Sequence, residues 1–172
     1  MFRESEKDRV NKLNACLAKI LSGMKPPEDL TVSQWADKNR RLTSESSAEV
    51  GKWRTSRTPY MFDILDSFTD PLIEHIVVVA ASQVGKSETI NNMVGYCIDQ
   101  DPGPILLIQP TIDDVKRYSE MRIAPMIRET RCLKRKVADP KSRDAANTKR
   151  QKSFPGGVLV MTGSNVAHDL SS

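Results

Sequence analysis

Three consecutive residues, Gly85-Lys86-Ser87, have the types and spacing that most directly indicate chemistry in this sequence. They follow an apolar run over residues 75–80 and precede a stretch that is compatible with a helix. In a strand, loop and helix of this kind, backbone N–H groups and the positive end of the helix can hold a triphosphate. Lys86 would reach the β- and γ-phosphates, and the Ser87 hydroxyl would hold Mg²⁺.

The loop as a whole is predicted to bind the nucleotide, through Ser82, Gln83, Val84, Gly85, Lys86, Ser87 and Glu88. The full phosphate-loop pattern has a glycine five residues before Gly85, where this sequence has Ala80. Alanine is tolerated there if φ stays negative, because only a positive φ makes a Cβ costly. The alternative is a buried strand that turns through Gly85 into a helix and binds no ligand. That alternative is weaker, since Gly-Lys-Ser at this joint would then be a coincidence.

Length and composition limit the class of protein. With 172 residues, the chain is long enough for one domain with an attached N-terminal extension. No apolar run approaches the roughly 20 residues of a membrane-spanning helix, and residues 1–20 are charged throughout. The sequence therefore predicts a protein inside a cell, with no membrane partner. Three widely spaced cysteines and two isolated histidines support neither a disulfide framework nor a zinc site.

Positive charge is concentrated near the end of the chain. Residues 128–152 include ten lysines and arginines against three acids, a balance of +7 in a chain whose net charge is +4. Such a segment favours a nucleic acid partner, because neutralising phosphates releases counterions. A solvated loop is the other interpretation, and charge alone does not decide between them. The candidate DNA-binding residues are Lys134, Arg135, Lys136 and Arg143.

Periodicity and helix-breaking residues predict the elements that position these groups. Apolar residues at helical spacing predict an amphipathic helix over 5–23, which we expect to pack on the core of the chain rather than on another protein. Further helices are predicted over 32–38, 59–68, 86–99, 112–121 and 125–130, strands over 75–80 and 105–109, and a hairpin of 148–154 with 158–162.

Two of these segments carry more detailed expectations. Residues 41–58 are predicted to form a loop held by Trp53. The helix over 86–99 is expected to bury Ile90, Met93, Val94 and Cys97. Strands that alternate with helices favour an α/β fold with right-handed crossovers.

Several short motifs occur in one unbroken order over roughly residues 30–172. They are Trp35-Ala-Asp37, Trp53-Arg-Thr55, Pro59-Tyr60, Gln83-Val-Gly-Lys-Ser87, Asp99-Gln-Asp-Pro-Gly-Pro104, Gln109-Pro-Thr111, Lys141-Ser-Arg143 and Phe154-Pro-Gly-Gly157. This series resembles the large terminase subunit of tailed phages of the lambda-like GpA type, in the N-terminal part of its ATPase domain. The order of the motifs is far more specific than the phosphate loop alone.

The resemblance implies an ATP-driven motor that packages double-stranded viral DNA into a capsid. It implies ATP and Mg²⁺ as cofactors, with Lys86 and Ser87 at the phosphates and the metal, and Gln109 and Thr111 relaying the nucleotide state to DNA. Implied partners are the terminase small subunit, the capsid portal and further copies of the chain, in the host cell cytoplasm. The implied fold is a P-loop NTPase of the RecA/ASCE-like type, a mostly parallel sheet flanked by helices.

The sequence departs from that family at three points. Met61 stands where many relatives have a glutamine that is taken to read the adenine edge, and a thioether offers no paired donor and acceptor. Ala80, Ala81 and Ser82 are neutral where relatives tend to carry a basic residue. No apolar strand after Ser87 ends in the acidic pair that a P-loop ATPase uses to hold Mg²⁺ and orient water, so no catalytic residue is identifiable.

We therefore expect a helical extension and loop over 1–58 and a partial, incomplete ATPase domain over 59–172 that stops before the acidic motif and the nuclease. Two other functions remain open. A helicase or restriction-type DNA translocase shares the loop and the strand ending in Gln-Pro-Thr. A non-catalytic DNA-binding module would use the basic segment 128–152 and leave the loop vestigial.

Overall fold

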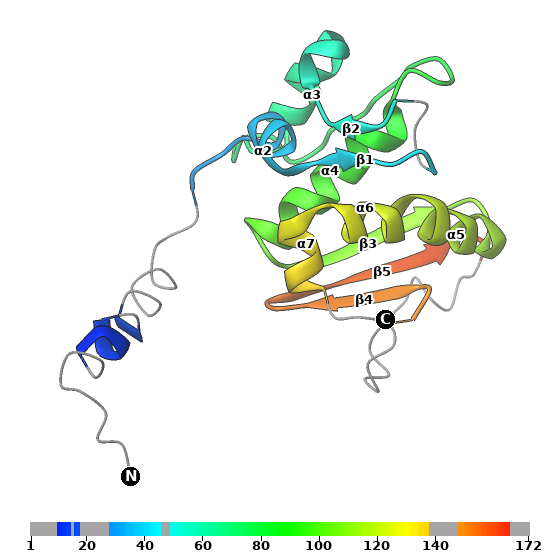
Figure 1. Ribbon diagram of the computed structural model, residues 1–172. Coiled ribbons are helices and arrows are strands. Elements are labelled where there is room, and N and C mark those ends of the chain that lie inside the picture. Colours follow the sequence, from blue (N-terminus) through cyan, green and yellow to red (C-terminus); the bar gives the residue numbers. More distant parts are fainter. Residues whose placement is uncertain (1–9, 15, 18–27, 46–48, 138–147, 166–172) are drawn as a thin grey trace.

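A three-stranded sheet forms the centre of the computed structural model, which describes residues 10–14, 16–17, 28–45, 49–137 and 148–165 (Figure 1). The strands β3 (Pro104–Gln109), β5 (Gly157–Gly163) and β4 (Gln151–Phe154) lie in the order β3-β5-β4. β3 and β5 are parallel, with Pro104 opposite Val158, whereas β4 and β5 form the predicted hairpin. The α/β class is confirmed, but the described sheet is mixed rather than mostly parallel.

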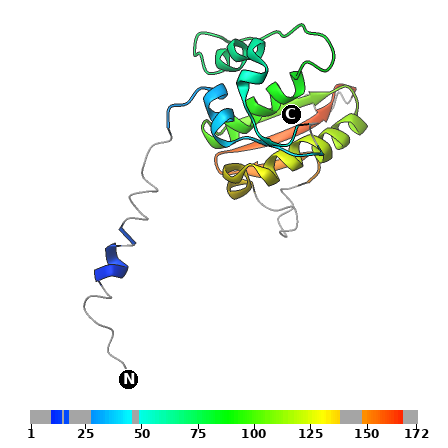
Figure 2. The same cartoon turned by 45° about the horizontal axis from the view of Figure 1, so that its top comes forward.

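Helices after the loop cover the sheet. They are α4 (Lys86–Asp99), α5 (Ile112–Tyr118), a π-helical turn η3 (Ser119–Ile123), α6 (Ala124–Glu129) and α7 (Arg131–Lys136). Figures 1 and 2 show α5, α6 and α7 lying along the sheet. Their buried side chains Val115, Ile123, Met126 and Leu133 join Leu107, Leu159 and Met161 of the strands in one core. α7 was not predicted, because this short helix is mostly basic and shows no hydrophobic period.

The elements before the loop form a second layer on α4. They are α2 (Val32–Asn39), β1 (Arg41–Leu42), β2 (Gly51–Lys52), the 3₁₀ turns η1 (Thr55–Arg57) and η2 (Pro59–Met61), and α3 (Phe62–Ser67). Thr31 caps α2 by accepting from the Gln34 N–H. The predicted loop over 41–58 is interrupted by the antiparallel pair β1–β2 and by η1. Trp53 anchors it as expected, since this side chain is buried and donates to Thr55 Oγ1 at 3.0 Å.

The predicted strand over 75–80 is wrong for this structure. Residues 73–81 have no regular secondary structure, and Val77 and Val79 are 86% and 95% exposed. A strand requires hydrogen bonds to a partner as well as an apolar run, and no described strand pairs with this segment. The apolar pattern is local, but strand pairing is not a local property.

The buried face of α4 also differs from the prediction. Val94 is buried as expected, but Ile90 is 46% exposed and Met93 and Cys97 are only half-buried. The buried face is displaced toward the small or polar residues Thr89, Asn91, Asn92 and Gly95, and it also includes Ile98. Along the predicted helix over 59–68, which η2 and α3 form, Leu65 is buried whereas Phe62 and Phe68 are exposed.

The N-terminal segment is helical over 10–14 and 16–17. Val10, Leu13 and Leu17 are 51%, 61% and 47% exposed, so the expected packing of this stripe on the core is wrong for these three residues. Ile20 and Leu21, which were part of the same stripe, lie outside the described residues. Within the described ranges, none of the helices has both the length and the apolar character needed to cross a membrane.

A close approach of α2 and α4 depends on a glycine. A Cβ added at Gly95 would lie 2.9 Å from Cζ3 of Trp35 and closer still to Cη2 of the same ring. Trp35 is completely buried, and its indole N–H donates to Asp99 Oδ2 at 2.8 Å. Gly95 and Asp99 are one helical turn apart, so the Trp35 ring and its indole N–H contact the same face of α4.

Asp99 also joins α4 to α7. Lys136 Nζ lies 2.9 Å from Asp99 Oδ1. Burial alone would raise the pKa of Asp99, but hydrogen bonds from Lys136, Trp35 and Gln100 outweigh it and hold the pKa below its usual value. The carboxylate therefore stays charged and connects α2, α4 and α7.

Replacing Gly95 with alanine should destabilise the fold. The added methyl group overlaps a buried ring that cannot move without opening the α2–α4 contact, so Gly95→Ala should lower the free energy of unfolding by about 1–3 kcal/mol. Urea denaturation measures the change. Gly103→Ala is the control, because a Cβ at Gly103 meets nothing within 4 Å. Equal stability of the two variants would contradict the proposed packing.

Removing the charge of Lys136 should also lower stability, in a pH-dependent way. At pH 7, Lys136→Met should cost about 1 kcal/mol, a value reduced because Lys136 is partly exposed. The pKa of Asp99 is depressed in the folded state, so this stabilisation is present above the carboxyl's unfolded-state pKa and disappears as the pH falls through the folded-state pKa. Thermal unfolding at pH 7 and below about pH 4 tests this. The control is Lys134→Met, at an exposed residue of the same helix. This variant should have the stability of the unsubstituted chain at both pH values.

Candidate functional site

The loop before α4 has the backbone geometry of an anion site. Gln83 and Gly85 both have positive φ, at 61° and 92°. Gly85 is the N-cap of α4 and supplies no side-chain hydrogen bond to the first turn. The helix begins with the Thr89 N–H bonded to the Gly85 carbonyl at 3.0 Å, which leaves the preceding N–H groups pointing out of the helix end. Such an end favours a phosphate.

Lys86 and Ser87 lie at this helix end, as the sequence predicts. Lys86 is folded back across the loop, where its ammonium group donates to the Ala80 carbonyl at 3.0 Å and to the Ala81 carbonyl. The ammonium thus already lies among oxygen acceptors inside the loop. Ser87 is exposed and follows it directly. Ser82 and Gln83 are also exposed, whereas Val84 and Gly85 are half-buried.

Glu88 differs from the other predicted loop residues in the direction of its side chain. Its carboxylate is bonded to the Arg40 guanidinium at 2.6 Å and lies 3.4 Å from Arg122 Nη1. The side chain is 12% exposed and belongs to a cluster behind the first turn of α4. Two cationic partners compensate this negative charge near a prospective phosphate site.

A hollow of about 230 Å³ adjoins the loop on the side of the N-terminal layer. Gln83, Val84 and Gly85 line it from the loop, and the segment from 49 to 60 lines the other side. Tyr60 joins the two walls by donating its hydroxyl to the Val84 carbonyl at 3.2 Å. Lys52, Arg54 and Arg57 also line this hollow, together with Glu88 and with Glu49, which is paired with Arg57. The sequence motifs indicated Tyr60 but gave no reason to place these three cations beside the loop.

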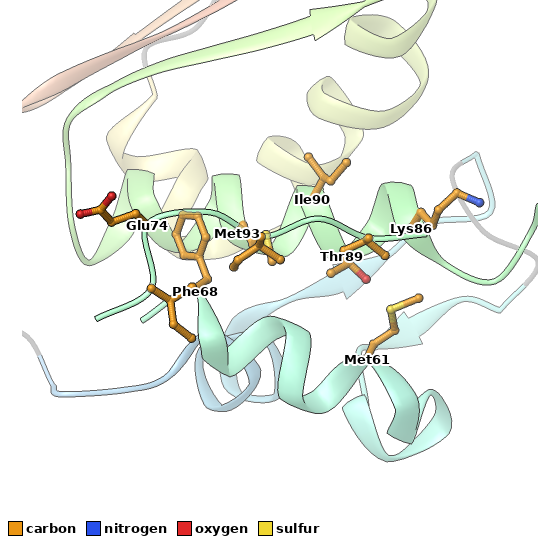
Figure 3. Close-up of a pocket in the computed structure, with 10 residues that line it drawn as sticks. Met61, Phe68, Glu74, Lys86, Thr89, Ile90 and Met93 are labelled. Carbon is orange, nitrogen blue, oxygen red and sulfur yellow. The ribbon is translucent and has the colours of Figure 1, made fainter. Parts of the chain in front are cut away.

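A larger hollow of about 490 Å³ lies between α3, α4 and the segment over 73–78 (Figure 3). Its lining is mostly apolar, with Phe68, Ile90 and Met93 among the contributors, while Lys86 and Glu74 lie toward opposite ends. Met61 is 2% exposed and forms part of this wall. Met61 therefore contributes apolar surface beside Lys86 where the amide of a glutamine would offer hydrogen bonds.

The predicted relay residues lie at the end of β3. The Gln109 carbonyl accepts from the Ser164 N–H at 2.8 Å, which ties the end of β3 to the residue after β5. Thr111 caps α5 by accepting from the Asp114 N–H at 3.1 Å and donating to Asp114 Oδ2 at 2.7 Å. Tyr118 at the other end of α5 reaches α4, where its hydroxyl donates to Asn91 Oδ1 at 2.7 Å. α5 thus connects the Gln109–Thr111 segment with the helix that follows the loop.

The structure divides the predicted DNA-binding residues. Lys134 and Arg135 are exposed on α7. Lys136 is engaged by Asp99, and Arg143 lies outside the described residues. Other cations of the basic segment are also paired: Arg128 with Glu45 and Glu129, and Lys149 with Glu120. Lys152 is 6% exposed and donates to the Thr148 carbonyl at 2.7 Å, and burial lowers its pKa. Part of the positive charge of this segment is therefore balanced by nearby carboxylates or buried.

Arg40 and Tyr118 contact the first turns of α4 and were not predicted. Arg40 lies in the polar run Lys38-Asn39-Arg40-Arg41, which carries the composition of an exposed surface. Its burial follows from the packing of the α2–β1 junction on α4, which no local pattern reveals. Tyr118 was expected in the helix after Thr111, but its partner on α4 could be found only in three dimensions.

Comparisons with known proteins identify related sequences. A family model described as phage terminase large subunit gpA, ATPase domain, matches residues 47–172. The terminase large subunit of Escherichia phage lambda is 27% identical over 149 residues, covering 87% of this chain and 23% of the relative. The terminase large subunit of Enterobacteria phage P21 is 27% identical over 132 residues, covering 77% of this chain and 20% of the relative. No match was found among solved structures.

The chain thus spans about a quarter or less of the length of these curated relatives. The family match includes the loop, α4, the strands of the sheet and the helices between them. Since it extends over far more than half of the sequence, the chain belongs to the family of phage terminase large subunit gpA ATPase domains.

Proposed function

We propose that this chain binds Mg-ATP at the loop over 82–88 and forms part of the motor that packages phage DNA. The observation that carries the proposal is Gly85-Lys86-Ser87 at the N-terminal end of α4, in a left-handed turn whose first N–H groups have no side-chain cap. The family match supports the nucleotide, and the printed names of the two relatives support the packaging role.

The residues of the loop suit a magnesium-bound triphosphate. Gly85 at φ 92° allows the backbone to turn without a Cβ, and the end of α4 attracts negative charge. Lys86 would exchange its two loop carbonyls for phosphate oxygens, which are stronger acceptors because they are charged. Ser87 is exposed beside it and offers a hydroxyl to the metal. When bound, Mg²⁺ neutralises charge on the phosphate oxygens.

ATP hydrolysis and DNA movement are proposed for the assembled protein. In the described part of the chain, β3 ends at Gln109 and β5 at Gly163, so neither strand presents an acidic pair beside the loop. We expect the loop to bind nucleotide and the acids that complete hydrolysis to come from elsewhere in the assembly. Double-stranded DNA, the small subunit, the portal and further copies of the chain are the expected partners, in the host cytoplasm.

A second proposed activity is direct contact with DNA through α7. Lys134 and Arg135 are adjacent and exposed, and Arg131 lies on the same short helix. Two exposed cations that are not paired with buried carboxylates can release counterions from DNA. This activity does not require nucleotide, so it can be measured separately from the loop.

Lys86→Ala should abolish most nucleotide affinity. Loss of the charge-assisted phosphate contacts should weaken Mg-ATP binding by about 10- to 150-fold, which calorimetric titration measures. Lys116→Ala on α5 removes an exposed lysine elsewhere and should leave affinity unchanged. Equal affinity of Lys86→Ala and the unsubstituted chain would refute the proposed site.

Lys134→Ala combined with Arg135→Ala should reduce the salt dependence of DNA binding. The slope of log K against log salt should become less steep by about 2, because two phosphate contacts are lost. Filter binding to a duplex of arbitrary sequence at several salt concentrations measures the slope. Lys116→Ala with Arg117→Ala is the matched control, since these two cations are paired with Asp113 and Asp114 on α5. An unchanged slope in the first double variant would remove α7 from the DNA interface.

A further inference from the structure

A buried arginine lies directly behind the first turn of α4. The Arg40 side chain is 1% exposed, and its three donor groups are all engaged. Nη2 donates to Glu88 Oε2 at 2.6 Å, Nε donates to Asn92 Oδ1 at 3.1 Å, and Nη1 donates to the Arg41 carbonyl at 2.9 Å. Burial lowers the pKa of Arg40, and Glu88 opposes that shift. A desolvated charge of this kind is costly to keep, and an apolar side chain would often serve stability as well.

The first turns of α4 are also contacted by α5 and the π-helical turn. Tyr118 donates its hydroxyl to Asn91 Oδ1 at 2.7 Å and lies 3.4 Å from the Ser87 carbonyl. Arg122 Nη1 lies 3.4 Å from Glu88 Oε1, and Asn91 Nδ2 donates to the same oxygen at 3.2 Å. Burial, reinforced by Glu88, raises the pKa of Tyr118, so its hydroxyl stays protonated and acts as a donor.

The π-helical turn helps to bring these groups together. It spans Ser119–Ile123, immediately after Tyr118, and includes Arg122. A π turn contains an additional residue, which changes the direction of the side chains that follow it. Tyr118 before the turn and Arg122 within it both reach α4. Such turns occur frequently at functional sites.

We propose that Arg40 and Tyr118 are positioning residues for the phosphate and magnesium site. They act through Glu88 and Asn91, which they contact from two different elements, and so determine the orientation of the Lys86-Ser87 turn. The inference rests on the proposed nucleotide binding and adds residues outside the loop to that site.

The charge of Glu88 explains why positioning is needed at this place. Glu88 directly follows Ser87, so an unpaired carboxylate there could turn toward the phosphates and repel them. Arg40 and Arg122 hold its carboxylate in ion pairs instead. Tyr118 meanwhile contacts the Ser87 residue itself through the main-chain carbonyl. One partner therefore controls charge near the site, and the other controls the orientation of the proposed metal ligand.

Tyr118→Phe tests the second role with the smallest change, since only the hydroxyl is lost. Mg-ATP affinity should fall about 5- to 10-fold, whereas ATP affinity in EDTA should fall less than about twofold, because Ser87 serves the metal. In the nucleotide-free chain, amides 87–91 should exchange with deuterium about 5- to 10-fold faster. Tyr96→Phe is the matched control on α4, outside the cluster, and should change neither quantity.

Arg40→Met tests the role in controlling charge. Mg-ATP affinity should fall more than about tenfold, and the double variant Arg40→Met with Glu88→Gln should recover most of that loss, because the uncompensated carboxylate is gone. If Arg40→Met fails to fold, Tyr118→Phe still decides the inference.

The outcomes separate the two proposals. If the unsubstituted chain binds Mg-ATP but Tyr118→Phe leaves both the magnesium dependence and the exchange of 87–91 unchanged, the positioning role is overturned alone. Lower thermal stability of Tyr118→Phe with an unchanged ratio of the two affinities overturns it as well. Failure of the folded, unsubstituted chain to bind Mg-ATP overturns the proposed function and the positioning role together.

Discussion

The attachment of α4 at both of its ends is the constraint on which the rest of this structure depends. At the C-terminal end, Gly95 lets the Trp35 ring approach, and Asp99 receives the indole N–H and the Lys136 ammonium. At the N-terminal end, Glu88 is held by Arg40 and Arg122. The helix therefore has a fixed position relative to α2, α5 and α7. Fixing the helix also fixes the end of the loop before it, because Lys86 and Ser87 belong to the first turn.

The two ends of α4 differ in the interactions that hold them. Packing around Gly95 is steric, so it tolerates no added atom and contributes through buried apolar area. The cluster around Glu88 is electrostatic and desolvated, so its value lies in geometry more than in net stability. A helix that carries a phosphate site at one end benefits from this arrangement. Its far end is fixed by close packing together with the bonds to Asp99, and its near end is oriented by the bonds to Glu88.

The apolar segment before the loop has a different environment. Val77 and Val79 are almost fully exposed, and β3 presents Leu106 and Ile108 at 53% and 47% exposure. Apolar side chains in a neighbouring α3–α4 hollow add to this surface. In contrast, the core beneath α5, α6 and α7 is closed, with Leu133, Leu159 and Val115 fully buried. The loop thus lies between a well-packed side and an open apolar side of the chain.

Sequence alone determined the local features whose cause is local. Gly85-Lys86-Ser87 at the start of a helix, the strand ending at Gln109 and the hairpin around Gly156 all depend on residue type and short spacing, and the structure contains each of them. The family resemblance followed from motifs in a fixed order and is confirmed over residues 47–172.

Tertiary structure decided everything that needs a distant partner. Residues 75–80 have the composition of a strand, yet strand formation requires a neighbour to accept its hydrogen bonds. Arg40 stands in a polar run and is buried, while Lys136 stands in a basic run and is paired with Asp99. Whether a charge faces solvent, a ligand or a buried carboxylate depends on which elements pack against it, and that is a property of the assembled fold rather than of the residue.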